Sequence, residues 1–569
     1  MESFSTKRQI NMQMLKNFLL AIITCYLSFL HAEISSNNNT GRILFLAQQG
    51  EHSKALQLYN QYFVLVGTHD FELLHQIGLS LVVEGFKQRD PESQLFALFG
   101  AGIAAHEDCY HVIEQGIKNP YPQIQLIALN TIARLQNNTA DRALFQALGS
   151  SEILIRLEAA HQLCLKKHPE AVSQTESLMY KVPKETIPLF PPLYACVGDE
   201  KAIRILRRML NNPSEKVRIA TILSLAKYER DDLLPQLRQQ IFHFNYAQQE
   251  AIAYALGSLK DEVSLNKLKT LSKSQYKNVA LAAHYALFQM GQKEALSYIE
   301  NAAKEENVFA IALLGEITEG SDTLIALQDS PHIQCRMNAA LALLEQVNPE
   351  CLINLSHLLI RNKHDLAVAE LASVGKAFKA WKIISSASQV LKDDLEAYAK
   401  NLYFREKILN KASHLPEPHF IKLATALLLN QQNDLIPLLV RLLEDLRTPT
   451  AIALLKEYHQ KVGAPLVRNY CNLALYRLKE PGPYGDYLKQ WVKSQNDQAL
   501  IRFRPFLPWQ FETPYQITPE ETSRLLIESF EAFSHNQDNA GIEALLDAIE
   551  KGHSKNKYAL AGLLIRATQ

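Results

Sequence analysis

The sequence lacks the short motifs that identify common catalytic sites. It contains no GxSxG nucleophile turn, no GxxxxGK[ST] phosphate loop and no GxGxxG dinucleotide loop. It has 18 histidines but a single histidine–glutamate dyad, His106–Glu107. A metal ion needs several converging ligands, and one dyad supplies too few. We therefore predict a non-enzymatic protein with no metal site and no cofactor.

The sequence also lacks a charge imbalance. Lys+Arg and Asp+Glu both number 59, so the formal net charge is zero. Proteins that bind nucleic acid usually carry a basic surface, so we predict no nucleic-acid partner. Apolar residues make up 47% of the chain, as in an ordinary globular protein.

Cysteine is scarce, with seven residues in 569 and no CxxC pair. This spacing excludes a zinc module and a disulfide-rich scaffold. Most of the cysteines lie in apolar helical patterns, where a thiol acts as a small hydrophobic group. The spacing is compatible with a single disulfide bond.

The N-terminal apolar run is short. Lys16 precedes "NFLLAIITCYLSFLHA", which ends at Ala32 and falls short of the roughly 20 residues that span a bilayer. A basic start, a short apolar run and a small final residue predict a signal peptide over residues 1–32. We expect an exported, periplasmic bacterial protein without a transmembrane span in the mature chain. The alternatives are a lipid anchor at Cys25, a buried or membrane-bound first helix, and a cytosolic scaffold.

One pattern recurs along the chain. "SPHIQCRMNAALALL" (residues 330–344) and "NPSEKVRIATILSL" (residues 212–225) share the template apolar-Arg-x-x-small-small-x-x-Leu. Copies with anchors at 124, 155, 217, 248 and 279 are separated by 31, 62, 31 and 31 residues. A degenerate copy at 192–199 occupies the doubled gap. A fixed period of this length indicates a repeat array.

Each copy opens with the same type of helix start. In the copies with anchors at 95, 124, 155, 217, 279 and 335, the residue five positions before the anchor can accept a hydrogen bond from a free backbone N–H; these residues are Asp90, Asn119, Ser150, Asn212, Ser274 and Ser330. In four copies a proline follows, which we expect at the first helical position: Pro91, Pro120, Pro213 and Pro331. Amphipathic segments such as "DEVSLNKLKTL" lie between these helices. The predicted fold is all-α, an α-α superhelix (α-solenoid) of stacked helical hairpins.

The segments "NPSEKVRIATILSLA", "AIAYALGSLKD" and "SSEILIRLEAAHQLCL" resemble the HEAT-repeat family, in particular the short repeats of phycobilisome lyases. The resemblance covers residues 90–345 well and residues 346–480 poorly. It implies that an Arg after each anchor bonds within the turn, a ladder that Gln125, Gln249 and Ala280 would interrupt. It also keeps open an enzyme of the HEAT-like lyase or metal-hydroxylase type. Residues 41–86 resemble a tetratricopeptide-like helical pair.

The predicted organisation runs along the chain as six parts. They are a signal peptide (1–32), a tetratricopeptide-like pair (41–89), a HEAT-like array (90–390), divergent helical repeats (391–500), a Pro/aromatic segment (501–518) and C-terminal capping helices (519–569). We expect "AVAELASVGKAF" (residues 367–378) to be helical, and Thr518, Pro519 and Glu521 to start a helix with a capping box.

Stacked hairpins present an elongated surface that suits a protein or peptide partner, which we expect on the concave face. The sixth residues after the anchors should form a column there: Asn130, His161, Leu223, Tyr254 and Tyr285. A few aromatic contacts often dominate an interface. The candidate partner-binding residues are His161, Tyr254, Tyr285, Trp509 and Phe511. The alternative is that these aromatic rings fill gaps between repeats or fix the 501–518 segment to them.

Overall fold

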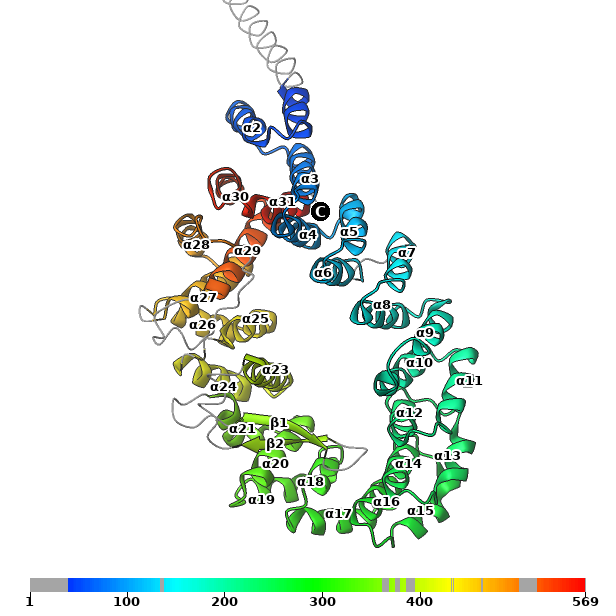
Figure 1. Cartoon of the computed structure of the whole chain (residues 1–569). Coiled ribbons are helices and arrows are strands. Elements are labelled where there is room, and N and C mark those ends of the chain that lie inside the picture. Colours follow the sequence, from blue (N-terminus) through cyan, green and yellow to red (C-terminus); the bar gives the residue numbers. More distant parts are fainter. Residues whose placement is uncertain are drawn as a thin grey trace, which may run out of the picture. The chain divides into compact units, whose positions relative to one another are not determined.

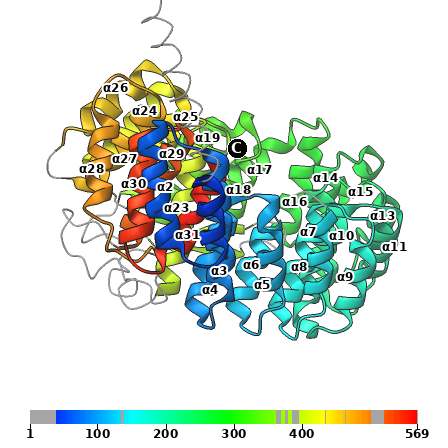
Figure 2. The same cartoon turned by 90° about the horizontal axis from the view of Figure 1, so that it is seen from above.

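The structure is a computed structural model that describes residues 39–133, 138–360, 368–373, 379–384, 395–430, 432, 434–461, 464–500 and 519–567. Its described part is an all-α solenoid of stacked helical hairpins, with one two-stranded β-hairpin added (Figures 1 and 2). No helix in these ranges combines the length and apolar character needed to cross a bilayer. The predicted signal peptide, Cys25, Trp509 and Phe511 lie outside the described residues.

The described residues divide into two compact units. Unit 1 takes its residues from Met1–Ala140, Lys489–Phe503 and Leu526–Gln569, and unit 2 from Asp141–Leu488 and Arg504–Leu525. The helices of unit 1 are α2 (His52–Val66), α3 (Phe71–Lys87), α4 (Pro91–Ala104), η1 (Glu107–Cys109), α5 (Tyr110–Ile117), α6 (Pro122–Ala133), α30 (Asn539–Lys551) and α31 (Asn556–Arg566). Helices α7 (Asn138–Ala147), α28 (Tyr484–Lys493) and α29 (Pro519–His535) each cross a boundary between the units.

Unit 2 contains the regular repeats. Its helices are α8 (Ile153–Leu165), α9 (Ala171–Met179), η2 (Lys184–Leu189), α10 (Pro191–Val197), α11 (Glu200–Met209), α12 (Glu215–Lys227), α13 (Leu234–Gln240), α14 (Tyr246–Ser258), η3 (Glu262–Ser264), α15 (Leu265–Leu271), α16 (Lys277–Gln289), α17 (Ala295–Lys304), α18 (Val308–Leu314), η4 (Thr318–Gly320), α19 (Ser321–Leu327), α20 (Ile333–Glu345), η5 (Pro349–Cys351), α21 (Leu352–Leu359), α23 (Leu395–Ala412), α24 (Glu417–Leu429), α25 (Ile436–Leu446), α26 (Pro449–Tyr458) and α27 (Pro465–Arg477).

The anchor helices of successive repeats lie directly against one another. Helices α12, α14 and α16 contact their neighbours in that order. Small residues allow this close approach: a Cβ added to Gly257 of α14 would lie 2.5 Å from the Cα of Ala286 in α16. Ala282 and Ala283 are completely buried. Neighbouring anchor helices therefore meet at small residues, here Gly257 and Ala286.

The side chain that follows each anchor binds the start of its own repeat. In five repeats it donates a hydrogen bond to the carbonyl oxygen six residues earlier. The pairs are Arg156–Ser150 (3.1 Å), Arg218–Asn212 (2.7 Å), Arg336–Ser330 (2.6 Å), Gln125–Asn119 (2.6 Å) and Gln249–His243 (2.8 Å). The expectation that glutamine interrupts this ladder was wrong, because the amide N–H of Gln125 and Gln249 reaches the same carbonyl as an arginine. Ala280 has no side-chain donor.

The residues five positions before the anchors accept hydrogen bonds as predicted, but mostly outside the helix. Only Asp90 is a helix N-cap, accepting from the Ser93 N–H at 2.8 Å. The others accept from the N–H two residues later, which makes a short turn before the helix; they are Asn119, Ser150, Asn212, Ser274 and Ser330. The helix thus begins later than predicted. Pro91 is the first residue of α4, whereas Pro120, Pro213 and Pro331 lie in the turn.

The prediction of a helix over residues 367–378 was wrong. Residues Val368–Ser373 form β1, which pairs antiparallel with β2 (Lys379–Ile384) in the register Val368 to Ile384. The second strand contains Trp381, Ile383 and Ile384, which favour a strand because aromatic and β-branched side chains fit a pleated surface. The hairpin interrupts the predicted 90–390 array, and β2 lies beside α18 and α20.

Unit 1 is held together by its last helix. Helix α31 contacts both α3 and α4, so residues near the two ends of the described chain share one interior (Figures 1 and 2). Glycine makes this possible: a Cβ on Gly562 would lie 2.0 Å from the carbonyl oxygen of Gly100, and one on Gly100 would lie 2.3 Å from that of Tyr558. Lys555 forms an ion pair with Asp90 at 3.2 Å at the edge of this contact.

Two further sequence expectations concern the cysteines and the last helices. All six cysteines of the described ranges are free thiols, and burial raises the pKa of Cys109 to about 12. A buried thiol with such a raised pKa stays protonated and acts as an apolar group. Helix α29 starts at Pro519, as the proposed capping sequence predicted, while Thr518 itself lies outside the described residues.

The hydrogen bond from Arg336 to the Ser330 carbonyl oxygen can be tested by substitution. Arg336→Ala should lower the free energy of unfolding by about 1–2 kcal/mol, because the Ser330 carbonyl loses its side-chain donor. Arg336→Gln should lose less than half of that amount, because glutamine serves the same role at Gln125 and Gln249. Urea unfolding monitored by circular dichroism measures both values.

Arg204→Ala is the matched control for the Arg336 variants. The Arg204 side chain is 64% exposed and forms only a 3.8 Å pair with Glu200, so we expect a change below about 0.5 kcal/mol. Equal losses for Arg336→Gln and Arg336→Ala would contradict the interpretation of the glutamines.

Candidate functional site

Two of the predicted binding residues stack on each other. Tyr254 of α14 and Tyr285 of α16 have ring centroids 5.5 Å apart and an interplanar angle of 25°. They are separated by one period of 31 residues, which places them at the same position of neighbouring repeats. Tyr285 is only 3% exposed, whereas Tyr254 is half-buried. The Tyr285 ring therefore has little surface to offer a partner, and only Tyr254 keeps an exposed part.

One period after Tyr285 the row continues with Glu316, just beyond the end of α18. The Tyr285 hydroxyl donates a hydrogen bond to Oε2 of Glu316. Glu316 keeps exposed surface, but this oxygen faces a buried ring. Desolvation raises the pKa of the Glu316 carboxyl, and the hydroxyl of Tyr285 offsets part of that rise. Burial, followed by the negative charge of Glu316, raises the pKa of both tyrosines. We call Tyr254, Tyr285 and Glu316 the tyrosine row.

Glu316 also lines a cavity of about 550 Å³ between α18, α20 and α23. The walls combine apolar side chains, such as Phe404 and Ile408, with charged ones. Lys411 forms an ion pair with Glu345 at 3.0 Å. No histidine, cysteine or serine occurs among the described residues that line it. The cavity is therefore a polar recess with balanced charge, and it lacks the usual nucleophile–base pair.

A buried arginine holds α23 in place beside this cavity. Arg405 is 1% exposed and donates to the carbonyl oxygen of Leu359 at 2.6 Å and to Gln432 Oε1 at 2.9 Å. It also forms an ion pair with Asp434. A buried charge is tolerated when it is paired and hydrogen-bonded in this way. Arg405 thus joins three segments of unit 2 and positions Phe404 in the cavity wall.

The remaining predicted site residues do not join the tyrosine row. His161 is exposed on α8, which α10 and α12 separate from α14. Its Nδ1 lies 3.8 Å from Oε2 of Glu158 in the same helix. Trp509 and Phe511 belong to a segment outside the described residues.

A different group of aromatic side chains is much more exposed. They are Phe242 (52%) and Phe244 (91%) in the turn before α14, Tyr246 (54%) at the first residue of α14, and Tyr276 (46%) just before α16. The rings of Tyr246 and Tyr276 stack with centroids 4.8 Å apart and an interplanar angle of 13°. We call these four residues the turn patch.

Polar groups surround the turn patch. Asn245 donates a hydrogen bond to Glu215 at 2.9 Å, and Lys277 forms an ion pair with Glu305 at 2.9 Å. An exposed apolar centre with a polar rim is the usual anatomy of a protein-binding surface.

The sequence contained a usable signal for part of this arrangement. Glu316 follows Tyr285 by the same 31 residues that separate the two tyrosines, so the period alone points to it. The turn patch could be suspected from "FHFNY" (residues 242–246), an aromatic-rich stretch at a turn. The cavity residues on α23 had no such signal, because their helix follows the β-hairpin and lies outside the regular period.

Comparison with known proteins gives one family match. The family model for HEAT repeats matches residues 203–287, from α11 to α16. This confirms the HEAT-like resemblance for the stretch that contains Tyr254, Tyr285 and the turn patch. No curated protein matches the chain in sequence. The tetratricopeptide-like character of residues 41–86 stays a prediction.

Several solved helical proteins are similar in structure. The complex of CpcE and CpcF of phycocyanin lyase from Nostoc sp. PCC7120 has 18% identity and a TM-score of 0.30, covering 36% of this chain and 87% of that chain. Human deoxyhypusine hydroxylase with glycerol has 17% identity and a TM-score of 0.20, covering 42% and 95%. Kap95p bound to RanGDP has 12% identity and a TM-score of 0.30, covering 90% and 80%.

The tyrosine row gives a prediction about pH. Tyr285→Phe should lower the free energy of unfolding by about 1–2 kcal/mol at pH 7, because a carboxylate loses a hydrogen-bond donor. The folded pKa of Glu316 is raised, so the folded state binds its proton more tightly than the unfolded state does. The contribution of Glu316 to the free energy of unfolding of the wild type therefore falls as the pH rises above the ordinary pKa of a glutamate. The effect of Tyr285→Phe should be smaller at pH 4, where Glu316 is protonated.

Urea unfolding at pH 4 and pH 7 measures this difference. Tyr276→Phe, at the start of the same helix with a 46% exposed side chain, should change little at either pH. Glu316→Gln should reduce the pH dependence. A loss for Tyr285→Phe that is the same at both pH values would argue against the charge of Glu316 as its cause.

Proposed function

We propose that this protein is a non-enzymatic scaffold that binds a protein partner through the turn patch of unit 2. The observation that carries the proposal is the exposure of Phe242, Phe244, Tyr246 and Tyr276 on adjacent repeats. Aromatic side chains dominate the energy of many interfaces, and leaving such a group in water is unfavourable. A polypeptide partner with apolar side chains satisfies this surface better than a nucleic acid would.

The position of the patch favours binding. Its residues lie at helix starts, where two hydrogen bonds hold the turn before α14. Gln249 donates to the His243 carbonyl oxygen, and the Gln248 N–H donates to Oδ1 of the N-cap residue Asn245. A held turn loses little conformational freedom when a partner binds, so more of the contact energy appears as affinity. The tyrosine row is the second candidate surface, with Tyr254 as its exposed ring.

The enzyme alternative has less support. The described residues of the cavity contain no nucleophile–base pair, and the described thiols are mostly buried with raised pKa values. The scaffold proposal therefore accounts for more of the exposed features of unit 2.

Partner binding can be tested on the turn patch directly. Cross-linking and purification from source cells identify a bound protein, and biolayer interferometry then measures its affinity for the full chain. The double variant Phe244→Ala/Tyr246→Ala should lose at least about 30-fold in affinity, the effect of removing about 2 kcal/mol at an interface centre. Tyr180→Ala, which changes a 71% exposed tyrosine elsewhere in unit 2, should change affinity less than twofold.

The variants distinguish the two surfaces. Loss of affinity in Tyr254→Ala, with the turn-patch variant unaffected, would move the binding site to the tyrosine row. Unchanged affinity in both variants would reject both surfaces. Circular dichroism confirms that each variant is folded.

Export is the second part of the proposal, supported by the sequence of residues 1–32. N-terminal sequencing of the mature protein should find Glu33 as the first residue, because Ala32 ends the predicted signal peptide. A chain that begins at Met1, Met12 or Met14 would instead support a cytosolic scaffold. A lipid-modified Cys25 would support the anchored alternative.

A further inference from the structure

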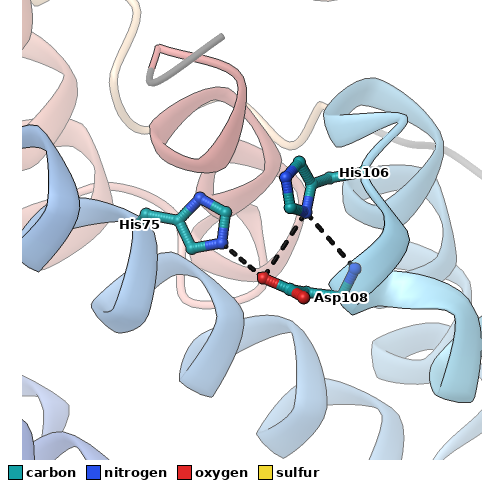
Figure 3. Close-up of side chains that lie close together, drawn as sticks. All are labelled: His75, His106 and Asp108. Atoms are coloured by element: carbon teal, nitrogen blue, oxygen red, sulfur yellow. Dashed lines mark hydrogen bonds and ion pairs between the residues drawn. The ribbon is translucent and has the colours of Figure 1, made fainter.

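Unit 1 brings two histidines and an aspartate together at the end of α4 (Figure 3). His75 Nε2 lies 2.8 Å from Asp108 Oδ2, and His106 Nδ1 lies 3.4 Å from the same oxygen. The two imidazole rings meet edge to face, with centroids 4.7 Å apart. Among the described residues, this is the one group of three histidine, cysteine, aspartate or glutamate side chains whose possible ligand atoms all lie within 4.8 Å of one another.

The fold creates this group from distant parts of the sequence. His75 is on α3 and only 8% exposed, while His106 and Asp108 lie at the start of η1. Helix α3 contacts η1 and α5, which carries His75 to residues 31 and 33 positions later in the chain. The sequence prediction of no metal site considered only the dyad His106–Glu107, and Glu107 is not a member of the group.

We propose that His75, His106 and Asp108 bind a divalent first-row transition-metal ion, with Zn²⁺ as the ion of this class to test. Two imidazole nitrogens and one carboxylate oxygen form a donor set that such ions accept. Bond lengths of about 2.0–2.2 Å place the ligand atoms of a tetrahedral site about 3.4 Å apart. The observed 2.8 and 3.4 Å separations therefore require only small side-chain movements around the ion.

The ion would replace two existing interactions. In the metal-free geometry, His75 and Asp108 share a hydrogen bond, and His106 Nδ1 accepts the backbone N–H of Asp108 at 3.3 Å. A bound ion would take the lone pairs of His75 Nε2 and His106 Nδ1. It therefore competes with the proton on His75 Nε2 and with the hydrogen bond that the Asp108 N–H donates to His106. The result is a clamp between α3 and η1.

The neighbouring side chains limit the site to three protein ligands. Cys109 follows Asp108 directly, but its side chain is completely buried and does not belong to the group of converging ligand atoms. His106 and Asp108 are 32% and 44% exposed, so solvent can reach the ion. Three protein ligands leave a position for water.

The test uses the full chain, produced without a histidine tag and stripped with a chelator. Co²⁺ titration should give visible absorption bands that saturate at one equivalent, and Zn²⁺ should displace them. Asp108→Asn and His106→Gln should each weaken Zn²⁺ binding at least about 10-fold, since even the loss of an outer-shell partner has effects of about 10–100-fold. A chromophoric chelator in competition measures these affinities.

His111→Gln is the matched control, because His111 follows Asp108 by three residues, lies on α5 outside the group of three, and places its Nε2 3.0 Å from Gln115 Nε2 at the surface. It should bind Zn²⁺ like the wild type. Zn²⁺ should also raise the melting temperature of the wild type more than that of Asp108→Asn, because only the folded state has the complete site.

Two outcomes would overturn the proposal. One is a wild-type chain that does not bind Zn²⁺ with a Kd below about 10 μM. The other is binding that Asp108→Asn and His106→Gln leave unchanged, which would show that the three side chains form only a hydrogen-bonded connection. If Asp108→Asn fails to fold, His106→Gln decides, since it changes a side chain outside the core.

Discussion

The structure depends on how closely one helical hairpin can approach the next. A single hairpin cannot bury its apolar stripe, so the stripe must be covered by a neighbour. The approach of α14 to α16 is so close that a Cβ on Gly257 would lie 2.5 Å from the Cα of Ala286. The same constraint acts in unit 1, where Gly562 meets the backbone at Gly100. Small residues at these positions set the spacing of the repeats, and larger ones would force the helices apart.

This constraint also decides where chemistry can occur. A repeat interior packed with alanine and leucine has little room for groups of polar side chains, and the buried group around Arg405 lies in the less regular part of unit 2. Polar and aromatic groups therefore collect where helices end. The turn patch precedes α14 and α16, the Glu316 carboxylate follows α18, and the His75–His106–Asp108 group lies at η1. Tyr285, in contrast, lies within a helix, and its ring is almost completely buried.

The regular part of the fold could be predicted from sequence because its signals are local. The anchor, the small positions and the hydrogen-bonding residue five positions earlier all fall within one helix and its turn. The finer geometry was less predictable: Gln125 was expected to break a ladder that it in fact maintains.

Contacts between distant segments had no comparable signal. Lys555 pairs with Asp90 across 465 residues, and His75 meets Asp108 across 33 residues that do not match the repeat period. The same holds for β1. The apolar spacing of its sequence is compatible with a helix, and only the pairing with β2 shows that it is a strand. Tyr254 and Tyr285 were predicted to be neighbours from the period, but the burial of Tyr285 depends on how α16 packs, which a single sequence does not show.

The ladder connects the fold to the proposed binding surface. In five repeats the residue after the anchor, either Arg or Gln, supplies a donor to a carbonyl oxygen at the start of the repeat. Because the turn backbone is held by this bond and by the side-chain acceptor before it, a side chain at an exposed position of the turn is not needed to hold its conformation. Phe244 and Tyr246 occupy such positions, between His243, whose carbonyl accepts the ladder bond, and Gln249, which donates it. Phe244 is 91% exposed and so contributes little to the repeat interior, which is why we propose that the turn patch binds a partner.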